Sequence, residues 1–168
     1  YATDHSLITS SVYFPKMNHE GASLMQVVTS DPVGNWSDIM QGLLLAITSA
    51  QKYIYVQTPY LLPTEPILVA LKTVALAGVD VRIMIPEKSD SQAIHWGTLS
   101  YLSELMEAGV KIYMYKKGFL HSKLMVSDDC LATVGSTNMD FRSFESNFEI
   151  NAFMYDRTSA LKLKDVFL

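Results

Sequence analysis

From residue 23 onward, the sequence alternates between short apolar runs and longer segments with the 3.6-residue periodicity of helices. This alternation restricts the possible folds more than any other feature, because a helical segment of a dozen or more residues can carry the chain across between two parallel strands. We therefore expect an α/β fold with a largely parallel sheet. The predicted strands cover 24–28, 53–57, 79–85, 110–115, 120–126, 130–135 and 147–155, and the predicted helices 38–50, 65–77, 91–108 and 157–168.

The rhythm changes near residue 120. The apolar runs 120–126 and 130–135 are separated only by Ser127, Asp128 and Asp129. A polar gap this short suits a tight turn between antiparallel strands and leaves no room for a crossover helix. The sheet should therefore be mixed, with parallel strands on one side and a hairpin on the other.

Size and composition favour one well-packed domain. The chain has 168 residues, of which 49% are hydrophobic and 18% charged, so disorder is excluded. We expect residues 1–21, which lack periodicity, to form a connector, and residues 22–168 to form the domain. The formal net charge of −4 gives no general attraction to nucleic acid, so an anionic ligand must be bound by local groups. Cys130 is the single cysteine, which excludes an internal disulfide and a cysteine cluster for zinc.

Membrane and secretory signals are also absent from the sequence as given. The apolar run 43–47 is far shorter than the ~20 residues of a membrane span. Residues 1–20 have neither the charged start nor the long apolar centre of a signal peptide. We therefore expect this chain to be soluble.

A dense motif lies between residues 121 and 138. It has the form H-x-K-x4-D followed by G-S-x-N, and by chance it would occur in roughly one chain in a few hundred thousand if each residue type is ~5% frequent. Its members are His121, Lys123, Asp128, Gly135, Ser136 and Asn138. The motif is therefore a strong indication of a functional site.

The spacing within the motif suits phosphoryl chemistry. On an extended strand, residues two apart share a face, so His121 and Lys123 point the same way, as do Ser136 and Asn138. Gly135, which has no Cβ, would let a bulky anion approach closely. Attack by the imidazole on a phosphodiester would give a phosphohistidine, and the other donors would stabilise the charge on its oxygens. Asp128 lies up to ~16 Å from Lys123, so we expect it to brace the turn.

Glu149 is a further candidate. In the predicted strand 147–155, the polar residues Asn147, Glu149 and Asn151 share one face. A carboxylate on that face could accept the ring N–H of His121 and stabilise an imidazolium.

The motif resembles the signature of the phospholipase D superfamily. Four segments, 53–63, 77–86, 105–121 and 119–156, are similar to the second half of the bacterial cardiolipin synthases of that superfamily. The resemblance implies an α/β/α sandwich around a mixed sheet, and a site formed where two such motifs meet. It implies transfer of a phosphatidyl group between two phosphatidylglycerols, with release of glycerol and with no cofactor. It also supports a role for Glu149, because family members carry an acidic residue at this distance.

Several residues outside the motif are further candidates. Gln57, Thr58 and Tyr60 follow a buried run, where residues line the crevice of an open α/β sheet, and Phe119 directly precedes the motif. These four are candidate substrate-binding residues, although plain loop structure explains them equally well. His95 and Trp96 are interpreted as a helix-surface histidine beside a half-buried tryptophan rather than as residues at the mouth of the site. We expect no metal, because Asp, Glu and His do not cluster with ligand spacing and Lys123 with Asn138 would supply the charge.

The motif occurs once, yet the reaction needs both a nucleophile and an acid. None of His5, His19 and His95 has a lysine two residues later. The second imidazole must come from a missing N-terminal half, with the chain cut at both ends, or from a second copy. By the resemblance the first-half histidine attacks, which would make His121 the acid.

The complete enzyme would act on phosphatidylglycerol and other anionic phospholipids at the bacterial membrane, and not on nucleic acid. A homodimeric phosphodiesterase or nuclease and a non-catalytic phosphate-binding module remain as alternatives.

Overall fold

The computed structural model describes residues 9–16, 21, 23–34 and 36–168. Within the expected connector 1–21, the described residues 9–16 are exposed and contain one turn of 3-10 helix, η1 (Ser11–Tyr13). The rest of that segment, except residue 21, lies outside the described residues. The boundary at residue 22 therefore stays a prediction.

Every predicted helix and strand is present, with shifts of a few residues at the ends. Besides η1, three short elements were not predicted: β3, β8 and α4. The elements in chain order are β1 (Met25–Ser30), α1 (Asp38–Ser49), β2 (Tyr53–Gln57), β3 (Leu61–Leu62), α2 (Glu65–Leu76), β4 (Asp80–Pro86), α3 (Gln92–Glu107), β5 (Lys111–Tyr115), β6 (Leu124–Ser127), β7 (Leu131–Gly135), β8 (Met139–Asp140), α4 (Phe141–Glu145), β9 (Glu149–Met154) and α5 (Arg157–Phe167).

The main sheet is mixed, in the order β1-β9-β7-β6-β2-β4-β5. The expectation that it would be largely parallel is wrong: within the described residues, only the pairings β2–β4 and β4–β5 are parallel, and the other four are antiparallel. The helical segment α1 does join two strands of the same direction, β1 and β2. However, β6, β7 and β9 lie between them, because a crossover helix fixes strand direction and not which strands are neighbours.

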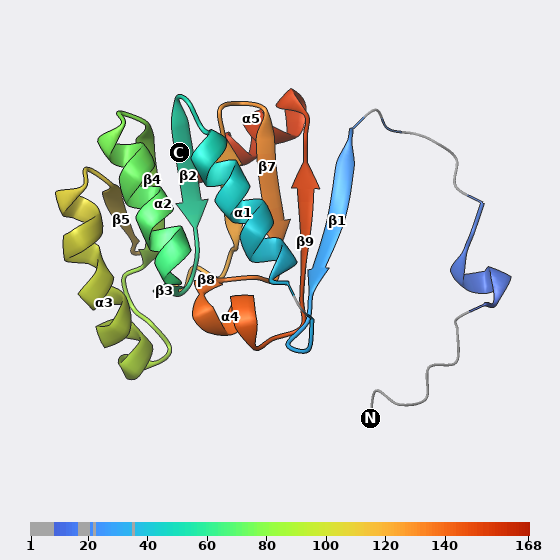
Figure 1. Cartoon of the computed structure of the whole chain (residues 1–168), viewed down its shortest axis with the longest axis horizontal. Coiled ribbons are helices and arrows are strands. Elements are labelled where there is room, and N and C mark those ends of the chain that lie inside the picture. Colours follow the sequence, from blue (N-terminus) through green and yellow to red (C-terminus); the bar gives the residue numbers. More distant parts are fainter. Residues whose placement is uncertain (1–8, 17–20, 22, 35) are drawn as a thin grey trace.

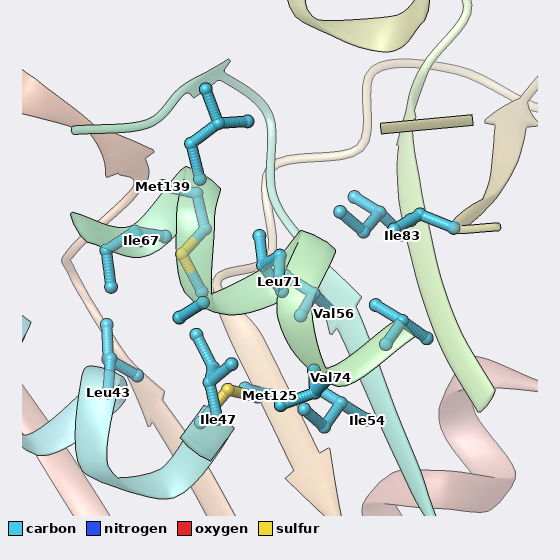
Figure 2. Packing of buried hydrophobic residues seen from close by; sticks show 14 of the residues in the cluster. Leu43, Ile47, Ile54, Val56, Ile67, Leu71, Val74, Ile83, Met125 and Met139 are labelled. Carbon is cyan, nitrogen blue, oxygen red and sulfur yellow. The ribbon is translucent and has the colours of Figure 1, made fainter. Parts of the chain in front are cut away.

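Helices cover both faces of this sheet, which confirms the expected α/β/α sandwich. Helices α1, α2 and α3 pack on one face and α5 on the other (Figure 1). The central strand β2 is buried along its whole length because it lies under both layers. Its Ile54 and Val56 join the larger core with Leu71 of α2 (Figure 2), whereas Tyr53 and Tyr55 pack with Phe167 of α5.

The strand directions place two sets of strand ends at opposite edges of the sheet. At one edge, which we call the site edge, lie Gln57 at the end of β2, Lys123 before β6, Gly135 at the end of β7 and Glu149 at the start of β9. This edge is at the bottom of Figure 1, beside α4. The β6–β7 turn lies at the opposite edge.

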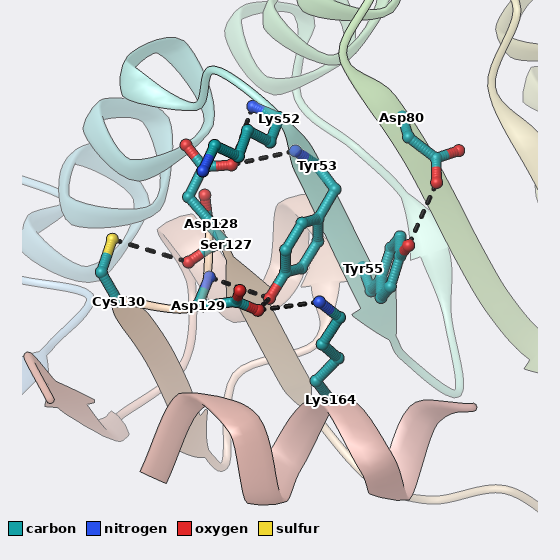
Figure 3. A network of polar contacts seen from close by, with 9 residues as sticks. All are labelled: Lys52, Tyr53, Tyr55, Asp80, Ser127, Asp128, Asp129, Cys130 and Lys164. Carbon is teal, nitrogen blue, oxygen red and sulfur yellow. Dashed lines mark hydrogen bonds and ion pairs between the residues drawn. The ribbon is translucent and has the colours of Figure 1, made fainter. Parts of the chain in front are cut away.

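The β6–β7 turn is fixed by a polar network. Asp128 and Asp129 both have positive φ, 53° and 58°, and Cys130 N–H donates to the Ser127 carbonyl at 3.1 Å. The Asp129 carboxylate accepts from the Tyr53 hydroxyl at 2.8 Å and from Lys164 Nζ of α5 at 2.8 Å (Figure 3). The predicted tight antiparallel turn is confirmed, and the network ties it to both β2 and α5.

A second ion-pair network joins three strands on the α5 face. Asp80 of β4 accepts from Arg82 at 2.7 Å, from Lys111 of β5 at 2.7 Å and from the Tyr55 hydroxyl of β2 at 3.1 Å. Burial by itself would raise the pKa of Asp80, but the hydrogen bonds from Arg82 and Lys111 outweigh it and lower that pKa to about 2.

This network predicts a pH-dependent contribution to stability. Because the folded-state pKa of Asp80 lies below its ordinary value of 3.8, its contribution is complete above that value and declines as the pH falls toward 2. Asp80→Asn should lower the free energy of unfolding by roughly 2 kcal/mol at pH 7 and by much less at pH 2. Urea unfolding at both pH values measures this, with the exposed Asp165→Asn as control. A loss of equal size at both pH values would contradict the ion-pair account.

Candidate active site

The motif's histidine and lysine lie together at the site edge. Strand β6 begins at Leu124, later than predicted, but Gly135 N–H still donates to the Lys123 carbonyl at 3.3 Å and extends the ladder by one bond. Lys123 Nζ lies 3.3 Å from both ring nitrogens of His121. Ser122 points the other way and donates to Gln57 Oε1 at 2.8 Å. The expected alternation of side chains therefore holds without a regular strand.

The Lys123 ammonium lies in a partly desolvated position. Burial lowers the pKa of Lys123, and the carboxylates of Glu149 and Asp140 oppose that shift by favouring the charged form. His121 is exposed, whereas Lys123 is half-buried. The result is a cation beside an open imidazole, which is the arrangement that would stabilise an anionic ligand at that position.

Glu149 contacts other partners than expected. Its carboxylate accepts from the Ser136 hydroxyl and, at 3.1 Å, from the Asn147 amide. Among the described residues, His121 is not one of its hydrogen-bond partners, so the expected His121–Glu149 bond is absent. The reason is the ladder: Ser136 N–H donates to the Ile150 carbonyl at 2.9 Å and Ile150 N–H to Ser136 Oγ at 3.0 Å, which places Glu149 beside Ser136.

Gly135 serves the protein backbone rather than a ligand. A Cβ at this position would lie 2.0 Å from Asn151 Oδ1 and 2.3 Å from the Ile150 carbonyl oxygen. Asn151 is buried and bonds the Thr137 N–H and Thr133 Oγ1, both at 3.3 Å. The expectation that Gly135 makes room for an anion is therefore corrected: its missing side chain lets β9 approach and so positions Ser136.

Asn138 is held by a residue that sequence reasoning missed. Its side-chain Nδ2 lies 3.1 Å from Ser143 Oγ, and its N–H donates to the same oxygen at 3.3 Å. Its Oδ1 is buried and has no hydrogen-bond partner among the described residues. If the amide turns by 180°, the Ser143 hydroxyl can donate to Oδ1, and Nδ2 becomes free as a donor for a ligand.

Gln57 and Thr58 are supports within the protein. Both are buried: Gln57 bonds Ser122 and, at 3.5 Å, the carbonyl of Val166, and Thr58 bonds the Tyr60 carbonyl at 2.8 Å. Of the two explanations open for these residues, loop structure matches their contacts. Gln57 orients the segment that carries His121 and Lys123.

Tyr60 and Phe119 lie on the side of the site where His121 is exposed. The ring centroids of Phe119 and His121 are 5.5 Å apart, and those of Phe119 and Tyr60 are 6.5 Å apart. The Tyr60 hydroxyl donates to Asp90 at 2.7 Å, and burial together with this bond raises the pKa of Tyr60 to about 12. His95 and Trp96 lie on α3, but the expectation of a half-buried tryptophan is wrong: Trp96 is 65% exposed, and His95 is the half-buried residue of the two.

A pocket of about 400 Å³ adjoins the motif, and no pattern in the sequence predicted it directly. Asn138 and Asn147 connect it to the motif. It is lined by Tyr60, Leu62, Ala93, Ile94, Asn138, Asp140, Phe141, Arg142 and Asn147. The D-x-x-S pattern of 140–143, a helix N-cap, was the one feature that could have drawn attention to this segment.

Asp128 lies at the opposite edge and braces the loop between α1 and β2. Its carboxylate accepts from three backbone N–H groups, those of Gln51 at 2.7 Å, Lys52 at 2.9 Å and Tyr53 at 2.9 Å. Figure 3 shows this carboxylate between the turn and β2. A bracing position was expected, but the segment that it holds is the α1–β2 loop, far away in sequence.

The described residues contain no group of three or more His, Cys, Asp or Glu residues placed to hold a metal ion. Within the same ranges, no helix has both the length and the apolar character that a membrane span requires.

Solved structures with the same fold define the class. The phospholipase D family member Nuc from Salmonella typhimurium has a TM-score of 0.73 at 20% identity, and the match covers 87% of this chain and 92% of that one. Phosphatidylserine synthase from Haemophilus influenzae has a TM-score of 0.63 at 17% identity, over 83% of this chain and 36% of that one. The fold is therefore that of the phospholipase D superfamily.

Sequence comparison identifies the family within that class. Residues 43–168 match the family described as cardiolipin synthase, PLD-like domain, and the chain belongs to that family. Cardiolipin synthase from Listeria monocytogenes is 45% identical over 99% of this chain, which corresponds to 35% of the relative. Cardiolipin synthase from Staphylococcus aureus is 49% identical over 93% of this chain and 32% of its own length. The chain thus spans about a third of these relatives.

Removal of the Asp128 carboxylate should act mainly on stability. Asp128→Ala deletes an acceptor shared by three N–H groups, so the free energy of unfolding should fall by about 3 kcal/mol. Activity of a complete enzyme containing this chain should decline no further than the folded fraction. Asp31→Ala, which removes a carboxylate that accepts one backbone N–H, at Val33, is the control. An Asp128→Ala enzyme that melts like wild type yet is inactive would refute the bracing role.

Gly135 should tolerate no side chain. Because a Cβ would overlap both the main chain and a buried side chain, Gly135→Ala should cost about 3 kcal/mol of unfolding free energy. Gly21→Ala, at a position with nothing within 4 Å of the added Cβ, is the matched control. Thermal unfolding of both variants decides the matter, and equal midpoints would show that the close approach of β9 is not required.

Proposed function

We propose that this chain is the C-terminal catalytic half of a two-motif cardiolipin synthase. The enzyme transfers a phosphatidyl group from one phosphatidylglycerol to another through a phosphohistidine and releases glycerol. The observation that carries the proposal is the position of Lys123 Nζ, 3.3 Å from both ring nitrogens of His121 at the site edge. The relatives from Listeria and Staphylococcus are named cardiolipin synthase, which supports cardiolipin as the product. Phosphatidylglycerol as the substrate and the bacterial membrane as the place of action are part of the proposal.

The site chemistry follows from these groups. One imidazole attacks phosphorus, an N–P bond forms, and the P–O bond to glycerol breaks while a second imidazole protonates the leaving oxygen. Lys123, with the Asn138 amide turned toward the ligand, stabilises the charge on the phosphoryl oxygens. Ser136 joins them when its hydroxyl proton turns from Glu149 to the ligand. In the second half-reaction a glycerol hydroxyl of another phosphatidylglycerol attacks, the P–N bond breaks, and the hydroxyl proton goes to the imidazole that served as acid.

The second imidazole would come from the other half of the enzyme, which has to pack beside this site. The α5 face of the sheet has an uncovered apolar area over β1, β9 and β7. Its members are Met25, Val27, Val134 and Ile150, which are 51%, 60%, 40% and 51% exposed. The Ile150 backbone bonds Ser136, so this area borders the site directly. A second half that covers it would bring its own motif to the same edge.

Mutation of the two central residues tests the proposal. In the complete enzyme, His121→Gln and Lys123→Gln should each lower cardiolipin formation on phosphatidylglycerol vesicles roughly thousandfold, because each removes a group that acts on phosphorus or its oxygens. His95→Gln and Lys88→Gln, on the α3 surface and in the loop before it, are the controls. Activity should also survive EDTA. Retained activity in His121→Gln, or a requirement for magnesium, would sink the proposed mechanism.

The chain alone should not make cardiolipin at an enzymatic rate, because it supplies one motif imidazole. The measurement is cardiolipin synthesis and DNA cleavage by the purified chain, with its oligomeric state from sedimentation. Full-rate cardiolipin synthesis by a dimer would replace the two-half proposal with a homodimer, and DNA cleavage would favour a nuclease. Lack of any activity in the complete enzyme would leave only a phosphate-binding module.

A further inference from the structure

The pocket beside the motif combines a polar and an apolar wall. Asn138, Asp140 and Asn147 form the polar wall, and Leu62, Ala93, Ile94 and Phe141 form the apolar one. We propose that this pocket is the acceptor site: it binds the headgroup of the second phosphatidylglycerol, a glycerol attached to a phosphodiester. This inference rests on the proposed function and adds to it a place and a set of residues for the acceptor.

Asp140 provides the recognition of hydroxyl groups. The residue is 5% exposed, and its Oδ1 accepts from Ser143 N–H at 2.6 Å as the N-cap of α4. The described residues provide no hydrogen bond to its other oxygen, Oδ2. This oxygen is open to the pocket, where a glycerol hydroxyl can donate to it in place of solvent. Asn147 adds an amide to the same wall.

Arg142 provides the recognition of the acceptor's phosphate. Its side chain is exposed, and it takes part in no ion pair within the described part of the chain. A guanidinium binds a phosphodiester with two parallel hydrogen bonds, which a lysine cannot do. Arg142 and Tyr60 both line the pocket, so the guanidinium is available to a ligand bound there.

The apolar wall explains why a lipid acceptor is preferred to water. Leu62 is half-buried and Phe141 is exposed at the rim, so a bound acceptor lipid would cover them and exclude solvent. Water, by contrast, gains nothing from these side chains or from Arg142. Transfer rather than hydrolysis therefore depends on the pocket.

The two glycerol groups of the reaction use the same position at different times. The leaving oxygen of the donor and the attacking oxygen of the acceptor both lie opposite the N–P bond. The leaving glycerol carries no further phosphate, whereas the acceptor glycerol does. Arg142 thus discriminates between the two half-reactions: it contributes to attack by the second lipid and not to release of the first glycerol.

The ratio of two products tests this inference. With the complete enzyme on phosphatidylglycerol vesicles, attack by lipid gives cardiolipin, and attack by water gives phosphatidic acid. Arg142→Gln should lower the ratio of cardiolipin to phosphatidic acid roughly tenfold, since it removes a bidentate phosphate contact. Asp140→Asn retains a side-chain oxygen for the cap of α4 but removes the charge, and it should lower the ratio as well.

Matched variants exist at the start of α5. Asp156 caps that helix through Ser159 N–H at 2.9 Å in the same D-x-x-S pattern, and Arg157 is an exposed arginine in its first turn. Arg157→Gln and Asp156→Asn should leave the product ratio at the wild-type value. Equal loss of both products in Arg142→Gln, with an unchanged ratio, would overturn the acceptor site. Absence of both products from the wild-type enzyme would instead refute the proposed function.

Discussion

The register of the β6–β7 hairpin is the constraint on which the site depends. Leu124 pairs with Val134 in this hairpin, and the next bond along joins Lys123 to Gly135. Because side chains alternate with a period of two, a slip of one residue would turn His121 and Lys123 to the opposite face, toward α5. The same slip would separate Lys123 from Ser136. Register alone therefore decides whether the motif forms one site.

The register is set at the edge farthest from the chemistry. Two consecutive aspartates with positive φ make the turn, and each carboxylate is held by another part of the chain. Asp128 bonds the α1–β2 loop, and Asp129 bonds Tyr53 and Lys164 (Figure 3). Asp128, the aspartate of the H-x-K-x4-D pattern, thus lies far from the site edge. Its spacing from Lys123 reflects the length of β6.

Sequence reasoning predicted the elements and the location of the motif, because hydrophobic period and residue spacing are local properties. The alternation of helices and strands, the tight turn near Asp128 and the shared side of His121 and Lys123 were all readable in this way. The order of the strands was not, since α1 determines only that β1 and β2 run in the same direction. Nothing local reports that β9 inserts between β7 and β1.

The details of the site also depended on long-range contacts. Glu149 bonds Ser136 instead of His121 because the β7–β9 ladder places the two side by side. Position 135 has to be a glycine because Asn151 lies where its side chain would be. Gln57 looked like a ligand contact because it ends a buried strand, yet its amide is used to hold Ser122. Asp140 and Arg142 could be identified as candidate ligand-binding residues only from the structure, because β8 and α4 place them around a pocket.

The central claim is that His121 acts together with an imidazole from outside this chain. A crystal structure of the complete enzyme with orthovanadate, which mimics the phosphoryl group in transfer, tests it most directly. The account predicts vanadate at the site edge with His121 on one side, a second H-x-K histidine on the other, and Lys123 on an equatorial oxygen. Vanadate bound away from His121, or with no second imidazole opposite it, would contradict the account.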